Sequence, residues 1–242
     1  MAETNEGQKW SMAQIGVVHS CYVEKFGIPR QPGLVTSAIA EVELLPPWNR
    51  EEMVKGLDEF SHIWIVFIFH AALAEGWKAT VRPPRLGGRT RVGVWASRSP
   101  HRPNHIGMSA VRLVKVVSGR DGLHLVVSGA DLLDGTPVID IKPYVQYSDC
   151  PNDVNNSYAV AEKALIAVQF SAEAERFCAE YCRDTGRDLQ RLIAESLTYD
   201  PRPASQRGKK EEFGMLFWDI NVNWRVQPWG LEVISCQPVR VG

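Results

Sequence analysis

The residues best suited to chemistry stand in one short segment, residues 98–107, with the sequence RSPHRPNHIG. Two prolines and a glycine restrict its backbone, so the side chains of Arg98, Arg102 and Asn104 are held in fixed directions. A guanidinium presents a planar fork of donors that matches a carboxylate or a phosphate. The segment therefore predicts a binding site for an anionic group.

Two further segments place polar groups on a shaped backbone. Residues 131–137 form a turn that carries Asp131 and Asp134, and residues 29–34 combine two prolines with a glycine. Asp140 and Lys142 follow on one face of the next strand, where a buried charge would need a partner. Taken alone, each aspartate of the turn more commonly caps that turn than takes part in chemistry.

Several common kinds of catalytic site are not indicated. His101 and His105 are four residues apart, but Pro103 between them prevents the regular helix that a helical metal pair needs. The five cysteines have no zinc-ligand spacing and none adjoins a basic cluster, so we expect reduced core thiols and no metal. Motifs of serine hydrolases, of dinucleotide-binding folds and of P-loop enzymes are missing from the sequence.

The charge distribution is uneven although the net charge is only -1. Residues 78–115 carry nine basic side chains, seven of them arginine, and no acidic one, whereas the segments on either side are acidic. One interpretation is a solvated face that these acidic segments balance in space. The other is a surface that binds an anion, either a nucleic-acid backbone or a charged cofactor.

The elements that must position these residues are mostly strands. Apolar patterns predict strands at residues 14–20, 40–44, 60–70, 91–96, 108–117, 123–127 and 137–143. Residues 60–70 are expected to be buried on both faces, and Asn49 with Glu52 is a candidate capping pair for a short helix. So many strands with scarcely a helix predict a β-barrel of about seven strands, not a Rossmann fold, in a domain at residues 12–148.

A different pattern follows a polar stretch at residues 149–159, which predicts a linker. The remaining residues, 160–242, predict a small α+β domain. Ser171 is expected to cap a helix, and a second helix is expected at residues 189–197. Residues 216–226 alternate in polarity and predict one half-buried strand, followed by a turn and a last strand at residues 231–236. The chain is thus expected to be mainly β.

Length and composition describe an ordinary globular protein. The chain has 242 residues, of which 45% are hydrophobic and 23% charged. Its longest apolar run, roughly 12 residues, is shorter than the roughly 20 that a membrane-spanning helix needs. The first residues lack the basic and apolar progression of a signal peptide. We therefore expect a cytoplasmic protein without membrane contact.

Taken together, the chemically suggestive segments resemble one family. Five segments in the same order, residues 29–34, 60–70, 82–88, 98–109 and 131–144, resemble the TrmO (TsaA-like) family. Residues 200–203 together with 218–224 resemble its bacterial members with an extra small C-terminal domain. The resemblance implies an S-adenosyl-L-methionine-dependent tRNA methyltransferase that works as a homodimer. It also implies methylation of N6 of threonylcarbamoyladenosine at position 37 of threonine tRNA.

The resemblance also assigns residues. The family's cofactor-binding positions correspond to Pro32, Gly33, Leu34, His70, Ala71, Arg98, Met108, Ser128, Gly129, Ala130 and Asp131. A polar residue usually follows that histidine in the family, and a second proline usually stands where this chain has His105. His70 and Asp131 are candidate catalytic bases by chemical type, because the methylated nitrogen must lose its proton.

Binding of the tRNA is a separate hypothesis. The candidate phosphate-contacting residues are Arg82, Arg85, Arg89, Arg91, Arg102, Arg202, Arg207, Lys209 and Lys210. Two alternatives remain open. The barrel could be an RNA-binding or regulatory module without catalysis, or it could use the same cofactor on a different acceptor. Cofactor binding distinguishes the non-catalytic module from an enzyme.

Overall fold

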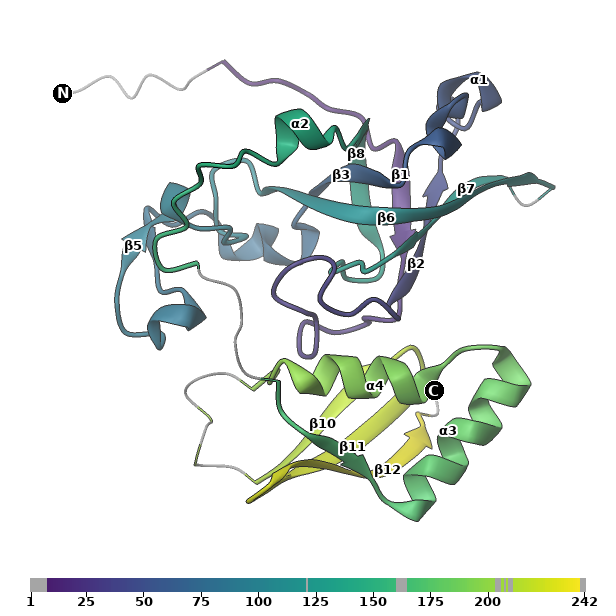
Figure 1. Ribbon diagram of the computed structural model, residues 1–242. Helices are drawn as coiled ribbons and strands as arrows, with labels where there is room; N and C mark the ends of the chain where they lie inside the picture. The colour runs from purple at the N-terminus through teal and green to yellow at the C-terminus, as the bar shows by residue number, and fades with distance from the viewer. Residues whose placement is uncertain are drawn as a thin grey trace.

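The computed structural model describes residues 8–120, 122–159, 165–202, 206, 208 and 211–239. An N-terminal β-barrel lies above a smaller C-terminal domain in Figure 1. The predicted architecture, a mainly β barrel with a small C-terminal α+β domain, is therefore confirmed. Within the described ranges, none of the helices is long and apolar enough to cross a membrane.

Six antiparallel strands form the closed barrel. In order around the barrel they are β1 (Gly16–His19), β2 (Ile39–Leu44), β7 (Gly122–Ser128), β6 (Ile106–Gly119), β3 (His62–Ile68) and β8 (Thr136–Pro143). β8 pairs with β1, so the sheet closes on itself without an open edge. Alternate residues of each strand point inward, and Ile63, Ile65 and Phe67 of β3 belong to the barrel core.

Three details of the predicted barrel are wrong. The expected seventh strand lies outside the barrel, because β5 (Val92–Gly93) pairs with β4 (Thr80–Val81) instead. β3 is buried on one face, since Trp64 and its neighbours on the other face are only partly covered. The short helix α1 (Glu51–Val54) begins after Arg50 without a side-chain cap, so Asn49 does not cap it.

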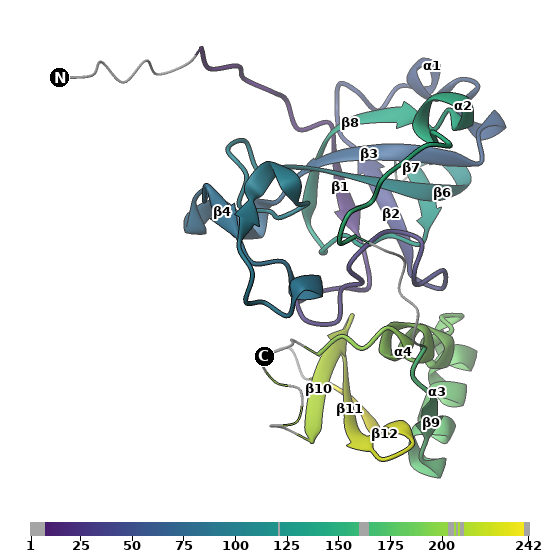
Figure 2. The same cartoon turned by 60° about the vertical axis from the view of Figure 1, so that its left-hand side comes forward.

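A long connection, residues 69–105, which we name the β3–β6 loop, leaves the barrel between β3 and β6. It holds β4 and β5 with three short 3-10 helices, η2 (His70–Glu75), η3 (Pro84–Leu86) and η4 (Val94–Ala96). Figure 2 shows this loop projecting from one side of the barrel. The Phe69 amide donates to the His105 carbonyl over 2.8 Å, so the two ends of the loop meet at the barrel. The remaining short helices are η1 (Leu57–Glu59) and α2 (Gln146–Asp149).

The C-terminal domain is one sheet covered on one face by two helices (Figure 1). Its strands are β9 (Val168–Phe170), β10 (Glu212–Phe217), β11 (Ile220–Gln227) and β12 (Gly230–Pro238), in the order β10–β11–β12–β9. The helices are α3 (Ala172–Thr185) and α4 (Leu189–Thr198). Ser171 Oγ accepts a hydrogen bond from the Ala174 amide over 3.1 Å, which confirms the predicted cap.

The predicted single strand at residues 216–226 is instead the hairpin of β10 and β11. Phe217 pairs with Ile220 across a two-residue turn, in which Trp218 has a φ of +51°. The buried residues of β10 are Phe213, Met215 and Phe217. The turn shifts the inward-facing positions by one residue, and the apolar alternation of Leu216 and Trp218 in the sequence conceals this shift.

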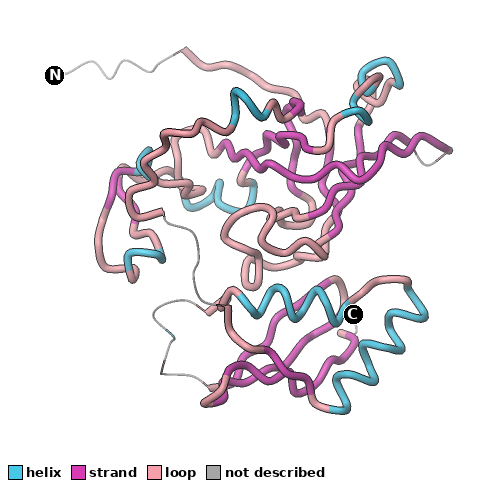
Figure 3. The backbone as a smooth tube through the Cα atoms, viewed as in Figure 1, coloured by secondary structure: helices cyan, strands magenta, loops and turns pink. Residues whose placement is uncertain are grey.

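Residues 20–38, the β1–β2 loop, connect two strands of the barrel and also contact the C-terminal domain. In Figure 3 this loop lies between the barrel strands and helix α4. Cys21, Tyr22, Val35 and Ala38 belong to the hydrophobic core of the C-terminal domain. The Trp218 amide also donates to the Cys21 carbonyl over 2.9 Å. The loop is therefore packed against both domains.

We expect Gly107→Ala to lower the free energy of unfolding by about 1–3 kcal/mol, as overpacking does in a filled core. A Cβ at Gly107 would overlap the buried ring of Phe67 and approach Phe69 Cε2 to 2.9 Å. Gly119→Ala on the same strand is the matched control, since an added Cβ there meets no described atom within 4 Å. Urea unfolding measures both variants, and equal losses would contradict the packing argument.

Candidate functional site

A cavity of about 780 Å³ opens at one end of the barrel. Its wall comes from four separate parts of the chain: residues 25–32 of the β1–β2 loop, 66–75 at the end of β3, 97–109 at the start of β6, and 131–136 before β8. Of the predicted cofactor residues, the following line it: Pro32, His70, Ala71, Arg98, Met108 and Asp131. The fold thus brings together residues that lie up to about 100 positions apart in the sequence.

Asp131 is the most strongly perturbed carboxyl in the cavity wall. Burial raises its pKa from 3.8 to about 6, although a hydrogen bond from Ser109 and the positive charge of Arg98 oppose this rise. Ser109 Oγ donates to Asp131 Oδ1 over 2.5 Å. A carboxyl with this pKa is mostly ionised at neutral pH and remains able to accept a proton.

The two arginines of the 98–107 segment have different environments. Arg98 is exposed at the cavity, and its Nη1 donates to Gln31 Oε1 of the β1–β2 loop over 2.7 Å. Arg102 turns back on its own loop, where Nη1 donates to the carbonyls of Ser97 and Ser99 over 3.2 and 3.4 Å. Arg98 is therefore placed to contact a ligand in the cavity, whereas Arg102 stabilises the loop that carries both arginines.

The other predicted cofactor residues form a joint between two loops. The Gly33 amide donates to the Gly129 carbonyl over 2.8 Å. Gly129 has a φ of +77°, and a Cβ there would lie 3.0 Å from Gly33 Cα, so the close approach requires glycine. Ser128 Oγ donates to the Thr36 carbonyl over 2.6 Å. Gly33, Leu34, Ser128, Gly129 and Ala130 are not among the residues that line the cavity, and of these Gly33, Ser128 and Gly129 hold the β1–β2 loop against the end of β7.

His70 begins η2 and lines the cavity beside Ala71. The last residue of the β3–β6 loop, His105, has a backbone conformation that proline cannot adopt. His105 has a φ of +52°, and its amide donates to the Arg102 carbonyl over 3.0 Å, whereas proline has a φ near -65° and no amide hydrogen. The loop of this chain therefore differs at residue 105 from a loop with a second proline.

An ion-pair cluster at the cavity was not predicted from the sequence. Lys25 Nζ lies 3.2 Å from Glu75 Oε1, and His101 Nε2 lies 3.6 Å from Glu75 Oε2. The hydrogen bond from Lys25 is the main reason that the pKa of Glu75 is lowered. Lys25 and Glu75 stand 50 residues apart, so no local pattern pairs them. The only hint is that Lys25 lies just before the segment of the β1–β2 loop that was already expected to shape a site.

The predicted tRNA-binding residues divide into four groups, the first of which is Arg102, already described as bonded to the carbonyls of its own loop. Arg82, Arg85, Arg89 and Arg91 lie together on the β3–β6 loop, and all but Arg85 are exposed. Arg202 is engaged elsewhere, because its guanidinium forms a fork with Asp200 at 2.6 and 3.1 Å and both side chains are only 13% exposed. Arg207, Lys209 and Lys210 lie outside the described residues.

Two tryptophans of the β3–β6 loop, which also carries these arginines, are exposed. Trp95 is 81% exposed and Trp77 is 62% exposed. An exposed aromatic ring next to a basic segment is typical of surfaces that stack single-stranded bases. In the part of the chain that the structure covers, no group of three metal-ligating side chains is found.

We expect Asp131→Asn to stabilise the protein at neutral and alkaline pH. The pKa of Asp131 is about 6 in the folded state, above its unfolded value, so the ionised carboxylate destabilises the fold above pH 6. The gain should reach at most ~3 kcal/mol at about pH 8 and vanish at about pH 3 and below, where wild-type Asp131 is protonated in both the folded and the unfolded state. Urea unfolding at the two pH values measures it. A variant that is equally destabilised at both would contradict this account.

Comparison with known proteins finds the same family for both domains of the chain. Residues 17–150 match the family described as "tRNA-methyltransferase O N-terminal domain", and residues 163–239 match "TrmO C-terminal domain". The chain is 47% identical to the tRNA (adenine(37)-N6)-methyltransferase of Escherichia coli (strain K12), over 93% of this chain and 97% of that one.

Two matches from Pseudomonas aeruginosa, one a curated relative and the other a solved structure, extend the comparison. One is 46% identical over 88% of this chain and 91% of its own length, and its name proposes an S-adenosylmethionine-dependent methyltransferase. The other is the crystal structure of TrmO, which is 38% identical with a TM-score of 0.80 and covers 95% of this chain and 99% of its own. The likeness therefore includes both domains.

Proposed function

Because this chain belongs to the tRNA-methyltransferase O family, we propose that it is an enzyme that transfers the methyl group of S-adenosyl-L-methionine to a tRNA. The acceptor is N6 of threonylcarbamoyladenosine at position 37 of threonine tRNA. The observation that carries the proposal is the single cavity in which Pro32, His70, Arg98 and Asp131 meet. The E. coli relative supports the position and the acceptor atom by its name, and the family resemblance suggests the threonylcarbamoyl group.

The side chains of the cavity suit this cofactor. Arg98 presents a guanidinium that matches the cofactor's carboxylate. Asp131 can accept hydrogen bonds from its amino or ribose groups. Phe69, Ile106 and Met108 give the cavity an apolar surface against which its uncharged parts can pack. When bound, S-adenosyl-L-methionine supplies an electrophilic methyl group on a positively charged sulfur.

The residues of the cavity must overcome the weak nucleophilicity of the acceptor. The acceptor nitrogen belongs to a urea-like group, so its lone pair is delocalised. Rigid walls that align this nitrogen with the methyl group therefore contribute most directly to the rate. Asp131 is the better-supported base, because its raised pKa suits proton removal near neutral pH. His70 lines the same cavity and is the second candidate.

The β3–β6 loop is the proposed tRNA-binding surface. Its exposed arginines can contact phosphates, and Trp77 and Trp95 can stack on unpaired bases of an anticodon loop. The loop begins and ends at the cavity, so tRNA bound along it would present position 37 near the cofactor. The homodimer stays a prediction of the family resemblance, and the cytoplasmic location stays a prediction from the sequence.

The decisive test of the reaction uses threonine tRNA with and without the threonylcarbamoyl group. We expect methyl transfer from S-adenosyl-L-methionine to the modified tRNA alone, detected by mass spectrometry of the released nucleosides. Transfer to unmodified adenosine would contradict the proposed acceptor, but the proposed enzyme class, a tRNA methyltransferase, would still stand. Absence of both transfer and cofactor binding would favour the non-catalytic RNA-binding module.

Arg98→Ala is expected to weaken binding of S-adenosylhomocysteine by roughly tenfold to a hundredfold, because a charge-assisted contact is lost. Calorimetric titration of the purified protein measures the dissociation constant. Arg112→Ala is the control, since Arg112 is an exposed arginine of β6 that does not line the cavity. Equal weakening in the two variants would remove Arg98 from the site.

Affinity for tRNA is expected to fall steeply with salt, with a log–log slope of roughly one per phosphate contact. Arg82→Ala combined with Arg89→Ala should reduce that slope by about two without changing cofactor affinity. Arg112→Ala combined with Lys115→Ala removes the same charge from exposed positions of β6 and serves as the control. If both double variants reduce the slope equally, the slope depends only on the charge removed, and this result would contradict a tRNA-binding surface on the β3–β6 loop.

A further inference from the structure

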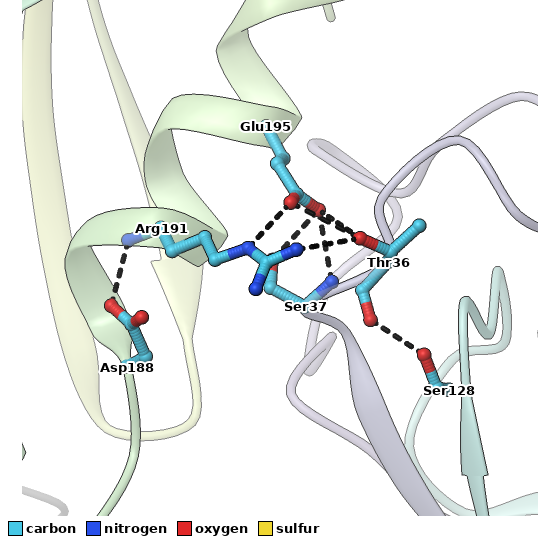
Figure 4. A network of polar contacts seen from close by, with 6 residues as sticks. All are labelled: Thr36, Ser37, Ser128, Asp188, Arg191 and Glu195. Carbon is cyan, nitrogen blue, oxygen red and sulfur yellow. Dashed lines mark hydrogen bonds and ion pairs between the residues drawn. The ribbon is translucent and has the colours of Figure 1, made fainter.

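A carboxylate of the C-terminal domain reaches the β1–β2 loop. Glu195 on α4 accepts hydrogen bonds from the Ser37 amide over 2.9 Å and from Ser37 Oγ over 3.0 Å. Thr36 Oγ1 lies 3.1 and 3.2 Å from its two carboxylate oxygens. Figure 4 shows the carboxylate facing this two-residue segment, with Arg191 beside it. Both carboxylate oxygens therefore accept hydrogen bonds from residues that closely follow Pro32–Gly33–Leu34 in the sequence.

The same segment is held from the barrel side. Ser128 Oγ donates to the Thr36 carbonyl, and the Gly129 amide donates to the Ala38 carbonyl over 3.0 Å. The Gly33 amide completes the set through its bond to the Gly129 carbonyl. Residues 33–38 therefore lie between two sets of polar contacts, one from each domain. A change on the α4 side would alter how this segment sits against β7 and the cavity wall.

The charge of Glu195 is well supported where it lies. Although partial burial opposes ionisation, hydrogen bonds from Ser37, Arg191 and Thr36 hold the pKa of Glu195 below its usual value. Arg191 Nε donates to Glu195 Oε1 over 2.8 Å and fixes the rotamer of the carboxylate. Asp188 accepts from the Arg191 amide at the start of α4 (Figure 4). The carboxylate is thus a fixed acceptor and not a mobile surface group.

We propose that Glu195 is a positioning residue for cofactor binding, through which the C-terminal domain sets the placement of the loop that carries Pro32, Gly33 and Leu34. The inference rests on the proposed function, because it assumes that this loop contacts S-adenosyl-L-methionine. It gives the C-terminal domain a role in cofactor affinity in addition to any role in tRNA binding.

Glu195 is not required to keep the domains together. Tyr22 is buried in the core of the C-terminal domain with Phe217, and their ring centroids lie 5.8 Å apart. The backbone bond from Trp218 to Cys21 and the bond from the Leu216 amide to Glu24 Oε1 add to this contact. Removing the Glu195 carboxylate leaves this apolar interface intact. Its loss should therefore act on the Thr36–Ser37 segment more than on docking.

The test compares Glu195→Ala and Glu195→Gln with wild type and with a matched control in the full-length protein. We expect Glu195→Ala to weaken S-adenosylhomocysteine binding by about tenfold. Glu195→Gln keeps one acceptor oxygen and should lose less. The control is Glu232→Ala, because Glu232 also has a lowered pKa and pairs with Arg225 and Gln227 within the C-terminal sheet. It should bind like wild type.

Steady-state kinetics separates positioning from general destabilisation. KM for S-adenosyl-L-methionine should rise in Glu195→Ala, while KM for tRNA and the melting temperature stay close to those of Glu232→Ala. Ser37→Ala removes one of the bonds to Glu195. The double variant Ser37→Ala/Glu195→Ala should then lose less than the sum of the two single losses.

The outcomes are distinguishable. Unchanged cofactor affinity in Glu195→Ala, with normal binding by wild type, would overturn the inference and leave the proposed function standing. Parallel rises in both KM values together with a lower melting temperature would show a purely structural role and overturn it as well. Wild-type protein that does not bind S-adenosylhomocysteine would overturn the proposed function, and this inference with it.

Discussion

The hydrogen bond from the Gly33 amide to the Gly129 carbonyl is the contact on which the rest of the site depends. It joins the β1–β2 loop to the end of β7, two segments almost 100 residues apart, with no side chain between them. The β-barrel fixes the end of β7. The hydrogen bond between Gly33 and Gly129 therefore restrains a long loop that has no regular structure of its own. The cavity has a defined shape because one of its walls is attached in this way.

The site also shows how function competes with stability. Asp131 is placed where burial disfavours its charge, and Ser109 and Arg98 compensate only in part. A buried carboxylate at this position weakens the fold at neutral pH, yet the same burial makes it a stronger base and a stronger partner for polar groups. The barrel can tolerate this cost because its closed sheet and packed interior supply stability elsewhere.

The basic segment, residues 78–115, serves more than one purpose. Arg102 stabilises the loop in which it stands, and Arg98 faces the cavity. The arginines between β4 and β5 lie on a projecting loop, and all but Arg85 are exposed. The sequence correctly indicated an unusual concentration of charge, and both of its interpretations, a solvated face and an anion-binding surface, stay predictions. Charge density alone does not say which guanidinium already has a partner.

The sequence by itself determined the architecture and most of the cavity. Apolar periodicity depends on nearest neighbours along the chain, so it located the six barrel strands and the helices α3 and α4, and the residue type of Ser171 indicated the cap of α3. The segments of the family resemblance contain five of the six predicted residues that line the cavity, and the sixth, Ala71, directly follows one of these segments. Periodicity failed where a turn changed the inward face without interrupting the pattern, as at Trp218.

Only the tertiary structure decided which polar groups meet. The pairing of Lys25 with Glu75, the engagement of Arg202 by Asp200 and the reach of Glu195 to Ser37 all depend on how side chains are oriented. The first and third of these also bring together residues far apart in the chain. The raised pKa of Asp131 likewise depends on the atoms that exclude water around it. Hydrogen bonds and desolvation act over a few ångströms in space, and only the folded chain fixes those distances.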